Sequence, residues 1–174
     1  MATAEERLME WLRDAHAMEA QAETMLATLA QRVVNYPDLE AQIELHLEET
    51  RRQAESLRQC IERRGGDTST SRDLAGKFVA FGQGLSGMLA SDEIVKGAIA
   101  SYAFEHMEIA TYNVLIAAAD AVGDSETKEA CQLNLEEEEA MADWLANNLH
   151  ATTFRYLGRE LADVGGDLAD VTAS

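Results

Sequence analysis

Long stretches of helical periodicity constrain the fold of this chain more than any other feature. Apolar residues recur at alternating steps of three and four across residues 4–34, 38–64, 91–122 and 124–149, which is the pattern of an amphipathic α-helix. The chain contains one proline, Pro37, and it lies between the first two stretches. The sequence therefore predicts an all-α protein in which each of four long helices buries one side.

Helix-breaking residues mark the ends of these predicted helices. Pro37 disfavours helix at the residue before it and suits the first turn of the helix that follows. Gly65 and Gly66 follow the second predicted helix, and Gly123 follows the third. Ser91 is a candidate N-cap for the third helix. The predicted boundaries therefore agree with residues that stop or start helices for local reasons.

The lengths of the connections limit how the four helices can be arranged. Tight turns join the first helix to the second and the third to the fourth, so each pair is predicted to form an antiparallel hairpin. About 26 residues separate the second helix from the third, and residues 74–89 within them can form a short extra helix. Four long helices with one long crossover make a ferritin-like bundle, and an up-down-up-down bundle with a decorated loop is the alternative.

This bundle is expected to occupy residues 1–150. Residues 151–174 are interpreted as a C-terminal tail with room for one short helix over residues 153–164, because Gly158 and the pair Gly165–Gly166 interrupt the pattern. A chain of 174 residues with 47% hydrophobic residues is long enough for one domain with one core.

The charge and the motifs exclude several classes of function. A net charge of −18, from 32 acids and 14 bases, opposes binding to nucleic acid and to anionic membranes. No apolar run approaches the length of a membrane span, and the polar N-terminus is unlike a signal peptide, so a cytoplasmic protein is expected. No glycine-rich phosphate loop or nucleophile elbow occurs. Cys60 and Cys131 lack metal-site spacing and are predicted to be buried free thiols.

Three glutamates and one histidine occupy positions that the helical pattern assigns to the interior. Glu19, Glu105 and Glu138 interrupt the apolar rows of the first, third and fourth helices, and His46 interrupts that of the second. Glu49 lies one turn after His46, at the edge of its row. All lie near the middle of their helices, so at 1.5 Å rise per residue they fall at similar heights. The sequence predicts that three carboxylates and an imidazole meet in one layer.

Such a layer needs compensating positive charge, because an unpaired ionised carboxylate is too costly to bury. No lysine or arginine lies on these rows, whereas a pair of divalent cations would balance the charge. Oxygen ligands with an imidazole suit iron or manganese, and zinc is a third choice. The alternatives are a wet polar layer without metal and, for the charge as a whole, a solvated acidic surface. Glu108, one turn after Glu105, is a further candidate ligand, and Tyr102 is a candidate hydrogen-bond partner.

Four segments of the chain resemble the YciE/YciF-type family of bacterial ferritin-like proteins. They are DAHAMEAQAETML, HLEETRRQAESL, YAFEHMEIATYNVL and LNLEEEEAMADWL, and the resemblance covers about residues 5–149. It implies a fold similar to those of rubrerythrin and bacterioferritin, a homodimer, a di-iron centre and a link to stress responses. The family's motifs would place metal ligands at Glu19, His46, Glu49, Glu105, Glu108 and Glu138.

The sequence departs from the usual di-iron pattern in two places. The second helix carries His46-x-x-Glu49 where Glu-x-x-His is usual, and the fourth carries Met141, not a histidine, three residues after Glu138. The site is therefore expected to be rich in carboxylates and to have one obvious imidazole.

Two functional hypotheses follow. The first is a protein with two divalent metal ions, iron before manganese or zinc, that oxidises iron with peroxide or dioxygen in a stress response. The second is a non-catalytic stress-response or interaction protein that keeps a ferritin-like scaffold with a structural or vestigial metal site. An iron-storage cage is a weaker third reading, since the glycine-broken tail makes a poor fifth helix.

Overall fold

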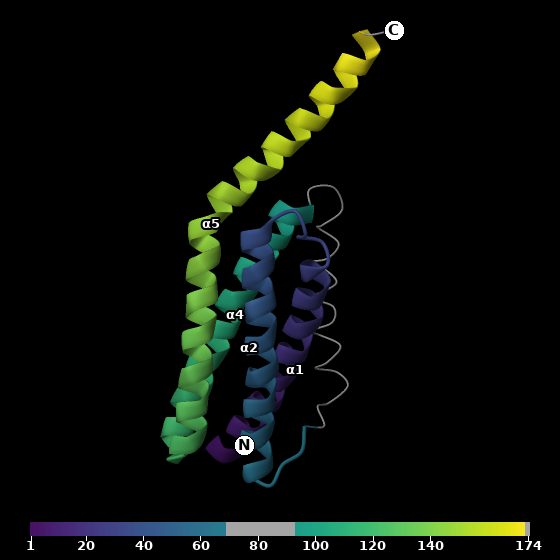
Figure 1. Ribbon diagram of the computed structural model, residues 1–174. Coiled ribbons are helices and arrows are strands. Elements are labelled where there is room, and N and C mark those ends of the chain that lie inside the picture. The colour runs from purple at the N-terminus through teal and green to yellow at the C-terminus, as the bar shows by residue number, and fades with distance from the viewer. Residues whose placement is uncertain (69–92, 173–174) are drawn as a thin grey trace.

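The computed structural model describes residues 1–68 and 93–172, and these residues form four helices (Figure 1). Helix α1 spans Ala4–Ala30, α2 spans Pro37–Arg63, α4 spans Glu93–Val122 and α5 spans Ser125–Thr172. The described residues contain no strand, which confirms the all-α prediction. The short helix predicted within the crossover lies outside the described residues. Within them, no helix is both long and apolar enough to cross a membrane.

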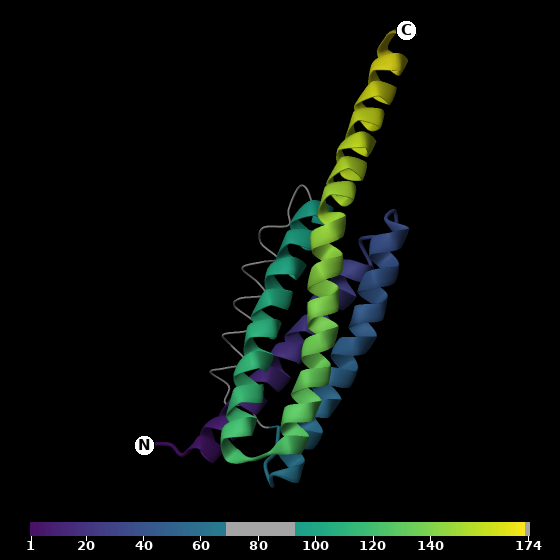
Figure 2. The ribbon, with the colours of Figure 1, turned by 90° about the vertical axis from the view of Figure 1, so that its left-hand side faces the viewer.

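The directions of the helices identify the topology. Helices α1 and α2 form one antiparallel hairpin, and α4 and α5 form another (Figures 1 and 2). Helix α4 begins at the end of the bundle where α2 also begins, so α2 and α4 run in the same direction (Figure 1). The end of α2 and the start of α4 therefore lie at opposite ends of the bundle. This confirms the ferritin-like arrangement with one long crossover and excludes the up-down-up-down alternative.

Local interactions explain where α1 and α2 begin. Thr3 caps α1 in a reciprocal arrangement, in which its hydroxyl accepts from the Glu6 backbone N–H and its own N–H donates to the Glu6 carboxylate. Pro37 occupies the first turn of α2. Helix α1 ends at Ala30 and not at residue 34, because residues 31–36 form the turn that reverses the chain.

The apolar core consists of two clusters along the bundle axis. One includes Leu12 of α1, Leu57 of α2 and Phe104 of α4, and the other includes Leu26 of α1 and Ile43 of α2. On α1 and α2 every position predicted to face the interior is buried. The predicted thiols also lie inside: both cysteines, Cys60 and Cys131, are buried and free.

The fourth helix differs from its prediction. It was expected to end near residue 149, but α5 continues to Thr172, and its last part extends beyond the bundle in both views (Figures 1 and 2). Glycine costs a helix about 1 kcal/mol relative to alanine, whereas proline costs about 3 kcal/mol. The tail has three glycines and no proline, so it weakens the helix without breaking it.

Asp124 ties α5 to the end of α2. Its carboxylate accepts hydrogen bonds from the Thr127 backbone N–H at 3.1 Å, from Arg63 at 2.6 Å and from Arg64 at 2.5 Å. Burial would raise the pKa of Asp124, but these partners outweigh it and hold that pKa below its usual range. Asp124 is thus both the N-cap of α5 and a link between the two hairpins.

We expect Asp124→Ala to lower the free energy of unfolding by about 2–3 kcal/mol, since it removes a cap and leaves two arginines without their shared carboxylate. Urea unfolding measures the change. Asp120→Ala is the control, because Asp120 is exposed and pairs with Lys128 at the surface, where a loss below about 1 kcal/mol is expected. Equal losses in the two variants would contradict the role of Asp124.

Candidate metal centre

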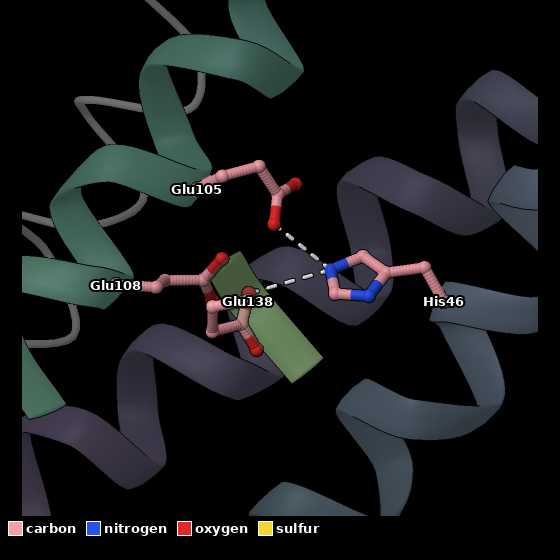
Figure 3. A group of neighbouring side chains, drawn as sticks. All are labelled: His46, Glu105, Glu108 and Glu138. Atoms are coloured by element: carbon pink, nitrogen blue, oxygen red, sulfur yellow. Dashed lines mark ion pairs between the residues drawn. The ribbon is translucent and has the colours of Figure 1, made fainter. Parts of the chain in front are cut away.

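Three helices bring four ligand-type side chains together inside the bundle. His46 comes from α2, Glu105 and Glu108 from successive turns of α4, and Glu138 from α5 (Figure 3). Each offers one ligand atom, and these atoms all lie within 4.8 Å of one another. All four residues are at most 1% exposed. The group therefore provides one nitrogen and three oxygens in a small, dry volume.

The imidazole of His46 links this group to a fifth residue. Its Nε2 atom lies 3.0 Å from Glu105 Oε2 and 3.4 Å from Glu138 Oε2 (Figure 3). Its Nδ1 atom, on the other side of the ring, lies 3.0 Å from Glu49 Oε2. Burial would lower the pKa of His46, but the contacts with the three carboxylates outweigh burial and raise that pKa to about 12. Without metal, His46 is therefore a cation.

Glu19 lies beside this group and has partners of its own. It comes from α1 and is fully buried. The hydroxyl of Tyr112 donates a hydrogen bond to Glu19 Oε1, and the Asn134 side-chain amide donates to the Tyr112 hydroxyl oxygen at 3.1 Å. Glu19 also faces the charges of Glu138 and Glu108. We call Glu19, His46, Glu105, Glu108 and Glu138 the polar layer.

Three of the four carboxylates of the polar layer, those of Glu19, Glu105 and Glu108, have raised pKa values when no cation is bound. Burial, reinforced by neighbouring carboxylates, raises the pKa values of Glu19 and Glu108 well above the ordinary value. Burial raises the pKa of Glu105 to about 8, even though His46 opposes the shift. For Glu138 burial also acts upward, but contact with His46 outweighs it and lowers the pKa. The layer thus contains more acid groups than one imidazolium can balance.

Several oxygens of this layer are suited to a metal ion. Glu19 Oε2, Glu108 Oε1 and Glu138 Oε1 are buried and have no hydrogen-bond partner among residues 1–68 and 93–172. A buried acceptor without a partner is costly, and a divalent cation is a partner that carboxylate oxygens favour. The donor set of carboxylates and one imidazole therefore fits iron or manganese.

The structure places the predicted residues as follows. Glu19, His46, Glu105, Glu108 and Glu138 all lie in the polar layer, and four of them form the tight group. Glu49 lies outside that group, against Nδ1 of His46, with 17% of its side chain exposed. Whether these residues bind metal stays a prediction.

The tyrosine that contacts the layer differs from expectation, whereas Met141 is buried, as expected for a core methionine. The tyrosine that bonds a carboxylate of the layer is Tyr112, whereas the ring of Tyr102 packs edge-on against His106 with centroids 4.6 Å apart. Met141 is buried, and its sulfur accepts a hydrogen bond from the Gln42 amide at 3.6 Å. Tyr112 follows Glu108 by four residues, so the helical spacing places it on the same side of α4. Nothing in the sequence pattern indicates that Tyr112 bonds to Glu19 of α1.

Comparisons with known proteins agree with this fold. Residues 3–158 match the family model described as a domain of unknown function, DUF892. Among solved structures, a protein from Xanthomonas campestris is 38% identical with a TM-score of 0.78, and the match covers 91% of this chain and 99% of that one. YcfI from Rhodopseudomonas palustris is 29% identical with a TM-score of 0.71, covering 84% and 94%.

The E. coli stress protein YciF is 24% identical with a TM-score of 0.78, and the match covers 88% of this chain and 98% of YciF. At this identity the likeness shows the fold. Because the family model matches most of its length, the chain belongs to the DUF892 family, and it has the ferritin-like fold of the YciF type.

Proposed function

We propose that the polar layer binds two divalent metal ions, iron in preference to manganese or zinc, and that the protein oxidises iron with peroxide or dioxygen. The observation that carries this proposal is the set of buried carboxylate oxygens without partners beside one imidazole. When bound, two ferrous ions would supply the two electrons that, together with two protons from solvent, convert one molecule of hydrogen peroxide into two of water.

The residues of the layer would divide this work. Glu105, Glu108, Glu138 and His46 would hold the ions through the four gathered donor atoms, and Glu19 would add a carboxylate from the α1 side. Their negative charge offsets that of the cations in a region of low dielectric constant. The apolar clusters at either end of the layer keep bulk water away from it.

Tyr112 and Asn134 have a positioning role in this proposal. The chain of hydrogen bonds from Asn134 to Tyr112 to Glu19 holds one oxygen of Glu19, which leaves Oε2 free to meet a cation. Groups that orient a ligand in this way commonly affect metal affinity or activity by about 10–100-fold.

We expect chelator-treated protein that is given ferrous iron under anaerobic conditions, and then peroxide, to develop the absorption of ferric iron. Glu19→Ala should slow the appearance of this absorption by about tenfold or more, since it removes a carboxylate from the layer. Glu23→Ala is the matched control, because Glu23 lies one turn further along α1 and pairs with Arg51 at the surface.

A wild-type protein that binds no iron would contradict the proposal. Melting with and without EDTA separates the remaining outcomes. A large shift of the melting temperature without faster oxidation than in buffer alone would favour the non-catalytic alternative, in which the metal is structural.

The metal-free protein should lose stability as the pH rises from about 5 to 8. Glu105 has a folded pKa of about 8 against an ordinary 4.5, so its contribution is complete below 4.5 and is lost as the pH rises through 8. The raised pKa values of Glu19 and Glu108 act in the same direction, as does that of His46 above pH 6.5. Each proton held only by the folded state contributes about 1.4 kcal/mol per pH unit.

Urea unfolding in EDTA at several pH values measures this slope. Glu105→Gln should reduce it, because the amide does not titrate. Saturating divalent metal should also reduce it, since the cation replaces the protons. Metal-free protein that is as stable at pH 8 as at pH 5 would contradict the assignment.

A further inference from the structure

Glu49 is a partly exposed residue in direct contact with the tight group of donor atoms. Its side chain is 17% exposed, whereas those of His46, Glu105 and Glu138 are at most 1% exposed. Its carboxylate touches His46 Nδ1 at 3.0 Å. Glu49 therefore connects bulk solvent to the interior through a single side-chain contact.

Glu49 also lies at the seam between α2 and α5. Gln42 and Gln53, seven residues before it and four after it on α2, both bond to α5: Gln42 to Met141 and Gln53 to Glu137. By helical spacing Glu49 belongs to the same side of α2. The partly exposed carboxylate of Glu49 therefore lies where α2 meets α5.

The imidazole of His46 stands between Glu49 and the buried carboxylates. Its Nδ1 faces Glu49, and its Nε2 faces Glu105 and Glu138 (Figure 3). Any ion that moves from Glu49 into the group must pass this ring. The contact between Glu49 and His46 is then the contact that the incoming ion has to displace.

We infer that Glu49 is the entry residue of the metal centre: it captures a divalent cation from solvent at the α2–α5 seam and passes it inward past His46. This inference rests on the proposed function, in that the polar layer must bind metal. In this inference Glu49 affects the rate at which metal is loaded, and it is not a ligand once the site is loaded. The net charge of −18 draws cations towards the surface, and Glu49 supplies the local point of capture.

The test is the rate at which chelator-treated protein takes up Co²⁺, followed by the visible absorption of the bound ion in stopped flow. Glu49→Gln should load about tenfold more slowly than wild type, the lower end of what a favourable local charge adds to an association rate. Its final absorption should be unchanged. Release to excess EDTA should slow by the same factor, because an entry residue alters both directions equally.

Glu48→Gln is the matched control, since Glu48 is the adjacent residue on α2, is 62% exposed and pairs with Arg51. It should load at the wild-type rate. Glu49→Asp keeps the charge on a shorter side chain and should load faster than Glu49→Gln. Circular dichroism shows whether each variant is folded, and the Asp variant serves if the Gln variant is not.

Three outcomes would overturn the inference. The inference requires Glu49→Gln to load more slowly than Glu48→Gln, so equal loading rates in the two variants would refute it. A lower final absorption with an unchanged rate makes Glu49 a ligand of the loaded site. If wild type itself takes up no Co²⁺, the proposed function fails and this inference fails with it. The first two outcomes overturn only the inference, because in both of them wild type still binds Co²⁺.

Discussion

The cost of placing carboxylates in an apolar interior is the constraint on which the rest of this structure depends. Four glutamates and one histidine share a layer in which each is at most 1% exposed. An ion pair between His46 and Glu138 offsets part of that cost, and protons on Glu19, Glu105 and Glu108 offset more. Neither the ion pair nor the protons provide hydrogen-bond partners for all the oxygens of the layer. A bound cation would provide such partners. Apolar packing elsewhere in the bundle must therefore offset the cost of burying this layer.

That packing lies on both sides of the layer. One cluster joins α1, α2, α4 and α5 from Leu8 to Cys131, and the other joins the same helices from Leu26 to Leu145. Each buried apolar side chain contributes about 1.5–3 kcal/mol, so the two clusters can support a polar layer that destabilises the protein when it is empty. Asp124 and its arginines hold the helices together at one end. The apolar clusters and the candidate metal centre thus occupy different levels of one bundle.

The sequence predicted the buried positions of α1 and α2, but those of α4 only in part. On the first two helices apolar and polar residues alternate clearly, since one side of each faces water. Helix α4 is more apolar than α1 and α2 and carries apolar residues on several sides, so its pattern does not determine its rotation. The structure buries Glu108 and Leu115, whereas Ile109 and Ile116, which lie at helical spacing from Glu105 and Tyr112, are half-buried. Contacts between helices, such as Tyr112 with Glu19, cannot be read from periodicity within one helix.

The division of the layer between the two hairpins has a consequence for assembly. The α1–α2 hairpin supplies Glu19 and His46, and the α4–α5 hairpin supplies Glu105, Glu108 and Glu138. Neither half gathers the donor atoms alone, so the two hairpins must pack together before these atoms meet. A cation held between them would link the two hairpins, and this link would form late in folding. Loss of the metal would then weaken the packing of one hairpin against the other before either hairpin unfolds.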